Sequence, residues 1–140
     1  EWEKMEGPTN SLNHPMHSGF AAYFYESLGG IKSSKEHPGY KEFIVNPKFS
    51  SKITNTAVSI PTPYGNIVNN WSIKNALLTM NLEVPFNTKA RLVLNQKELE
   101  SLKLNGESFE EFQKKNKLTV LDNITVVIGS GNYQIEYLKS

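Results

Sequence analysis

The chain has 140 residues, of which 38% are hydrophobic, a formal net charge of +1 and no cysteine. Its length allows one domain with its own core, and the absence of cysteine excludes disulfides, thiolate chemistry and cysteine-ligated zinc within it. Because the charge is close to zero and Arg91 is the single arginine, nucleic acid is not expected as a partner. No apolar run approaches the about 20 residues of a membrane span, so no membrane partner is expected either.

The first segment, residues 1–13, is rich in Gly, Pro, Thr, Asn and Ser and lacks periodicity, which predicts a loop. Glu1, Glu3 and Glu6 form an acidic cluster around Trp2. A carboxylate beside an aromatic ring is a combination that sugar hydrolysis and sugar binding use, because the ring stacks on a sugar face while the carboxylate handles protons. The alternative is a solvated chain end, where charged residues serve only solubility.

Apolar residues recur every fourth position from Met16 to Leu28, so the spacing predicts a helix over about 15–28 with its apolar face buried. The paired glycines that follow can supply a left-handed C-terminal turn, and we expect Gly29 or Gly30 at positive φ.

Two histidines stand at the start of this predicted helix. His14 and His17 are three residues apart, and a pair at that spacing can bind a metal ion or share a proton. No aspartate lies nearby and no third ligand has a clear spacing, so we expect no metal site and favour a capping or substrate-facing role for His14. No glycine-rich phosphate loop precedes a helix, and no cofactor is expected.

The pattern changes after the helix. Residues 32–39 form a polar connector containing Pro and Gly, and the hydrophobic period then changes from 3.6 to 2. Short, evenly spaced strands of this kind are typical of an antiparallel sandwich. The predicted strands are Tyr40–Asn46, Ile53–Ile60, Asn66–Lys74, Leu77–Val84, Thr88–Leu94, Leu118–Val120, Ile124–Ile128 and Tyr133–Leu138.

Turn residues punctuate these strands. The segment Pro61–Gly65 predicts a hairpin-type reversal, and Gly129–Asn132 predicts a second one. Residues 96–117 are harder to assign, although Asn105-Gly106 predicts a tight hairpin turn and Glu110–Phe112 a short helical turn.

Aromatic residues in the strands suggest a second kind of site. Tyr40, Tyr64, Trp71 and Tyr137 could form a platform on which sugar rings stack, but aromatic residues in strands more often pack in the core, and we favour the core. Trp71 and Val68 do not share a period of two, which requires a bulge or a two-sided strand.

An ordered series of short motifs covers nearly the whole chain. In chain order they are Trp2-Glu3 followed by Gly7, Ser11-Leu12-Asn13-His14, Phe24-Tyr25, Leu28-Gly29-Gly30-Ile31, Pro38-Gly39-Tyr40-Lys41, Pro63-Tyr64-Gly65 and Gly129-Ser130-Gly131 followed by Tyr133. The series resembles the C-terminal end of bacterial α-L-rhamnosidases of glycoside hydrolase family 78. Two features depart from the family pattern: Met5 stands where a second aromatic residue is frequent, and residues 110–117 have no family counterpart.

The resemblance implies an architecture. In such enzymes an (α/α)6 barrel carries catalysis and a C-terminal β-sandwich follows it. Residues 1–35 would be the last piece of the barrel, a loop and its final helix, and residues 36–140 the sandwich, which is mostly β, antiparallel and jelly-roll-like and packs on its own barrel.

The resemblance also implies a function. The family inverts configuration, so a general acid and a general base flank the glycosidic bond. Glu3 matches the general base, His14 matches a sugar-contacting histidine, and Trp2 matches the tryptophan before the base. We therefore expect a fragment of an enzyme that releases terminal α-L-rhamnose from rhamnosides, inactive alone because the general acid lies upstream. The alternative is a non-catalytic, carbohydrate-binding or structural accessory sandwich. The compartment stays open between cytoplasm, periplasm and secretion.

Overall fold

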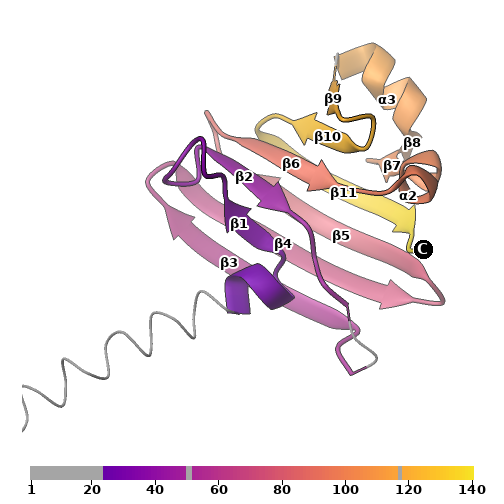
Figure 1. The fold of residues 1–140 in the computed structure, drawn as a ribbon, viewed down its shortest axis with the longest axis horizontal. Helices are drawn as coiled ribbons and strands as arrows, with labels where there is room; N and C mark the ends of the chain where they lie inside the picture. The colour runs from indigo at the N-terminus through magenta and orange to yellow at the C-terminus, as the bar shows by residue number, and fades with distance from the viewer. Residues whose placement is uncertain (1–23, 50–51, 117) are drawn as a thin grey trace, which may run out of the picture.

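The computed structural model describes residues 24–49, 52–116 and 118–140, and these form two packed β-sheets (Figure 1). The five-stranded sheet has the order β1 (Ile31–Ser33), β2 (Glu42–Val45), β6 (Lys89–Val93), β10 (Thr125–Ile128), β9 (Thr119–Leu121). The six-stranded sheet has the order β3 (Asn55–Thr62), β4 (Gly65–Lys74), β5 (Leu77–Val84), β11 (Gly131–Leu138), β7 (Lys103–Leu104), β8 (Glu107–Ser108). The prediction of a mostly β sandwich is confirmed at this level.

The sandwich is held together by alternating side chains. Along β5, every second residue from Leu78 to Val84 is buried, while the residues between them are exposed or half-buried. Phe43 of β2 and Leu92 of β6, both fully buried, come from the other sheet and join the same hydrophobic cluster. Each strand therefore has one inner face and one outer face, as a period of two requires.

The long strands β3, β4, β5 and β11 pair antiparallel, with continuous registers. The reversal predicted at Pro61–Gly65 is confirmed as the β3–β4 hairpin, in which Gly65 has φ +125°. The register of β4 has no bulge. Trp71 points inward and Val68 lies half-buried on the outer face, so the two-sided strand is the correct reading.

One pair departs from the antiparallel prediction, because β2 and β6 run parallel. After β2 the chain leaves the five-stranded sheet to form β3, β4 and β5, and it returns as β6 in the same direction. A parallel pair needs such a long crossover. The reversal predicted at Gly129–Asn132 is also a crossing rather than a hairpin, since β10 and β11 belong to different sheets.

The connector predicted over 32–39 begins too early. Residues Ile31–Ser33 form β1, which pairs with β2 at the edge of the five-stranded sheet. A strand of three residues, of which only Ile31 is apolar, has too little alternation to be recognised alone and depends on its neighbour for backbone hydrogen bonds. The boundary between residues 35 and 36 stays a prediction, but residues 31–33 belong to the sheet.

The segment 96–117 contains two helices around a short hairpin. Helix α2 (Gln96–Ser101) starts at a capping box formed by Asn95 and Glu98, and α3 (Phe109–Asn116) contains the predicted helical turn. Between them, β7 and β8 are joined by the predicted tight turn, with both Asn105 and Gly106 at positive φ. Figure 1 shows this segment packed at one side of the sandwich.

The predicted helix over 15–28 is not confirmed. Residues 15–23 lie outside the described residues, and the remaining part is a five-residue π-helix, η1 (Phe24–Leu28). The chain then turns at Gly30, whose φ of +69° agrees with the expected positive value. A Cβ at this position would lie 2.3 Å from the backbone of Pro47, so only glycine fits.

Candidate functional site

The three residues predicted to act on a sugar, Trp2, Glu3 and His14, lie outside the described residues. Their roles therefore stay predictions. The described residues do show how the chain enters the sandwich directly after that segment, and what surfaces the sandwich offers.

The entry point is held by two inward-facing side chains of β4. Asn69 donates from Nδ2 to the carbonyl of Gly29 at 2.7 Å, and Trp71 donates from Nε1 to the carbonyl of Leu28 at 2.9 Å. Asn69 is fully buried, and its Oδ1 has no partner within the described residues. Buried donors that meet carbonyls at a helix end take the place of the missing backbone donors. The direction of the chain at Leu28 is therefore fixed by the sandwich.

Sequence reasoning did not find this anchor. The available signal is a polar residue, Asn69, at an inward position between Ile67 and Trp71, where an apolar side chain is expected. Such a residue needs a buried partner, but the identity of that partner depends on the fold.

The proposed aromatic platform does not form. Trp71 and Tyr137 are each 2% exposed within the core, and Tyr40 packs against it. Tyr64 is 37% exposed and lies in the turn before β4. The core interpretation is confirmed for Trp71 and Tyr137. Burial raises the pKa of the Tyr137 hydroxyl above its ordinary value, and the negative charge of Glu98 raises it in the same direction.

A charged cluster lies on the outer face of the five-stranded sheet. Arg91 of β6 pairs with Glu42 of β2 through Nε and with Glu36 through a contact of 3.4 Å between Nη2 and Oε2. His37 approaches the second oxygen of Glu42, also at 3.4 Å. The hydrogen bond that Arg91 donates to the Glu42 carboxylate is the main reason that the pKa of Arg91 is raised, against a smaller opposing effect of burial. All these charges are partnered within the sheet and its β1–β2 loop.

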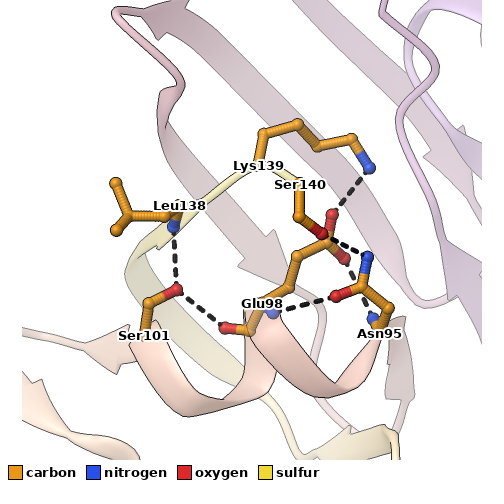
Figure 2. Close-up of polar contacts among 6 residues, drawn as sticks. All are labelled: Asn95, Glu98, Ser101, Leu138, Lys139 and Ser140. Atoms are coloured by element: carbon orange, nitrogen blue, oxygen red, sulfur yellow. Dashed lines mark hydrogen bonds and ion pairs between the residues drawn. The ribbon is translucent and has the colours of Figure 1, made fainter.

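A second polar network fastens the end of the chain to α2, as Figure 2 shows. Lys139 lies 2.7 Å from Oε1 of Glu98, whose other oxygen accepts from the backbone N–H of Asn95 at 3.0 Å. Asn95 also donates to the hydroxyl of Ser140 at 2.7 Å. Lys139 lies 5.3 Å from the centre of the Phe49 ring, a cation–π distance. Because the Glu98 side chain is 4% exposed and completely engaged, this network is structural.

The outer face of the six-stranded sheet carries polar side chains of a different kind. Two neighbouring hollows lie on it, of about 390 and 320 Å³, and both are lined by Asn70 and Asn81. Glu83 is the one charged residue among their described lining residues. The two hollows therefore share a polar floor of carboxamide side chains.

Among the described residues, no three His, Asp or Glu side chains gather closely enough to hold a metal ion. None of the described helices is both long and apolar enough to cross a membrane.

Comparison with known proteins decides the family. A model of the bacterial alpha-L-rhamnosidase C-terminal domain matches residues 30–109. The chain belongs to this family. It is 64% identical to an alpha-L-rhamnosidase of Formosa agariphila over 139 residues, which are 99% of this chain and 15% of that protein. The resemblance inferred from the short motifs is therefore confirmed, and the chain spans only a small part of the length of this relative.

Solved structures agree on the fold of this C-terminal domain. The alpha-L-rhamnosidase of Streptomyces avermitilis, complexed with L-rhamnose, matches 81% of this chain and 10% of its own with a TM-score of 0.63 and 16% identity. The alpha-L-rhamnosidase of Dictyoglumus thermophilum matches 84% of this chain and 13% of its own with a TM-score of 0.62 and 24% identity. At these identities the likeness shows the fold alone.

Proposed function

We propose that the chain is the C-terminal part of an inverting α-L-rhamnosidase that releases terminal α-L-rhamnose from glycosides, and that it is inactive by itself. The observation that carries the proposal is the 64% identity over 99% of the chain. This match extends beyond residues 30–109 of the domain model and so takes in the segment that contains Trp2, Glu3 and His14.

In this proposal Glu3 is the general base. An inverting glycosidase holds a water between the base and the anomeric carbon, while the general acid protonates the leaving oxygen from the opposite side, and the two carboxyl groups stand about 6.5–9.5 Å apart to leave room for that water. Trp2 would form part of the sugar-binding wall, and His14 would hold a sugar hydroxyl.

The alternative of a sandwich that binds sugar through exposed aromatic rings loses its main support. Two of the four residues that would have formed the stacking platform, Trp71 and Tyr137, are buried. A structural accessory role is compatible with the proposed function, since the same domain can pack on the rest of a longer protein.

The decisive test is Glu3→Gln in the full-length enzyme. Glutamine keeps the shape of the side chain and removes its basicity, so kcat on an aryl rhamnoside should fall at least about a hundredfold with a much smaller change in KM. The purified 140-residue chain provides the baseline and should show no hydrolysis of the same substrate.

Two further variants make this test specific. Glu6→Gln, a glutamate of the same segment without an assigned role, should keep kcat within about threefold of the wild type. His14→Ala should raise KM at least as much as it lowers kcat if it holds a hydroxyl. A Glu3→Gln enzyme with kcat within about threefold of wild type, or turnover by the chain alone, contradicts the assignment.

A further inference from the structure

The outer face of the six-stranded sheet has an unusual row of side chains. In the strand registers, Asn70 of β4 lies opposite Asn81 of β5, and Asn81 lies opposite Gln134 of β11. These three residues, here called the carboxamide row, are all exposed. Asn105, in the β7–β8 turn, continues the row, since its Oδ1 accepts from the backbone N–H of Gln134 at 2.8 Å.

The carboxamide row is not explained by the stability of the sheet. Asn is depleted in strands because it packs poorly on a pleated surface and competes for backbone hydrogen bonds. Within the described part of the chain, the side chains of Asn70, Asn81 and Gln134 make no hydrogen bond to other residues. Each keeps two N–H donors and one carbonyl acceptor available.

The surroundings of the row favour a neutral ligand. The two hollows that meet at Asn70 and Asn81 have a single charged residue among their described lining residues, Glu83. A lone carboxylate repels phosphates, sulfates and uronates, and no arginine or lysine is present there to bind them. Val68 and Ala57 line the hollows beside the row and offer apolar contact.

We propose that the carboxamide row and its two hollows bind a neutral oligosaccharide. Sugar hydroxyls are donors and acceptors at once, so they match carboxamides that carry both groups, and the C–H faces or the methyl group of a 6-deoxy sugar fit against Val68 and Ala57. The inference deepens the proposed function: the sandwich would hold part of the glycan whose terminal rhamnose the longer enzyme releases. It is a surface for hydrogen bonding rather than for aromatic stacking.

The proposed binding of an oligosaccharide can be tested in the full-length enzyme by asking whether the sugar protects a cysteine placed at the site from a thiol reagent. Because this chain has no cysteine, a single one can be placed by substitution and followed on its own peptide by mass spectrometry. Ser72 lines the second hollow, whereas Ser59 is exposed on the outer face of β3 and lines neither hollow. Ser72→Cys therefore reports on the site, and Ser59→Cys is the matched control on the same sheet.

The probe is a tetrasaccharide of α-linked L-rhamnose at millimolar concentration, with sulfur in place of each glycosidic oxygen so that the enzyme does not hydrolyse it. It should slow the reaction of Ser72→Cys with a maleimide at least about fivefold and leave Ser59→Cys unchanged. Adding Asn70→Ala and Asn81→Ala to Ser72→Cys should abolish the protection. A tetragalacturonate, equal in length but charged, should not protect.

Several outcomes overturn the inference. Protection that is absent, that persists without Asn70 and Asn81, or that is equal with tetragalacturonate excludes a neutral glycan held by the carboxamide row. A Ser72→Cys thiol that is unreactive without sugar, while Ser59→Cys reacts, shows that another part of the enzyme covers the face. None of these results depends on turnover, so hydrolysis of an aryl rhamnoside by the wild type tests the proposed function separately.

Discussion

The two outer faces of the sandwich use their polar side chains in opposite ways. On the five-stranded sheet, Arg91, Glu42 and Glu36 satisfy one another in ion pairs, and aliphatic residues such as Ile44 lie beside them in the register. On the six-stranded sheet, the carboxamide row leaves its donors and acceptors open to solvent. Polar groups that are paired internally contribute to folding, and polar groups that are left unpaired are available to a ligand.

The largest expected effect separates the inner face from the outer face along a single strand. Leu82 of β5 is 2% exposed and its neighbour Asn81 is exposed. Leu82→Ala should lower the free energy of unfolding by about 2–5 kcal/mol, whereas Asn81→Ala should change it by no more than about 0.5 kcal/mol. Urea unfolding of the purified chain measures both. A loss above about 1 kcal/mol for Asn81→Ala would show that the carboxamide row holds the fold.

A smaller loss in the free energy of unfolding is expected from a substitution on the outer face of the five-stranded sheet. Arg91→Met removes the partner of Glu42, whose side chain is 13% exposed, and leaves that carboxylate with His37 alone. The cost should be about 1 kcal/mol, since the pair is partly screened by water, and it should shrink in high salt.

Lys89→Met is the matched control for this variant. Lys89 is exposed two positions before Arg91 on the same strand, and its loss should leave the urea midpoint unchanged. If Arg91→Met also leaves the midpoint unchanged, the ion pairs do not stabilise the sheet, and the contrast between the two faces is lost.

The smallest expected change in the free energy of unfolding is an increase, not a decrease. Asn70→Thr places a residue with higher strand preference in the middle of β4, and it should raise the free energy of unfolding by up to about 1 kcal/mol. The same variant should weaken the protection of Ser72→Cys by the tetrasaccharide, because it removes one carboxamide of the proposed site. A gain in stability with a loss of binding is expected, since residues kept for binding are often not the most stable choice. Ser59→Thr on the edge strand β3 should change neither. A destabilised Asn70→Thr protein would mean that Asn70 has a structural role.

The strands with clear alternation were predictable from the sequence, and β5 has the predicted bounds Leu77–Val84. Elements that depend on distant partners were not: β1 exists through its pairing with β2, and the parallel pair β2–β6 follows from the path of the chain between the sheets. Helix α2 was missed although its capping box, Asn95 with Glu98 three residues later, is a local signal.

The candidate sites also differ in whether local sequence or distant partners define them. Motif resemblance pointed to Trp2, Glu3 and His14 and identified the family, but it does not place those residues in space. The carboxamide row could not be found from the sequence, because Asn70, Asn81 and Gln134 become neighbours only when the register of three strands is known. Each of these residues alone reads as an ordinary polar residue at a surface position.

The path of the chain between the two sheets has a consequence for how such a domain can be inherited. The chain passes from one sheet to the other between β2 and β3, β5 and β6, β6 and β7, β8 and β9, and β10 and β11. Neither sheet is a continuous stretch of sequence, so neither can be cut out, duplicated or exchanged by a single recombination event. Shuffling of gene segments can therefore move this sandwich between enzymes only as a complete unit, with both of its outer faces together.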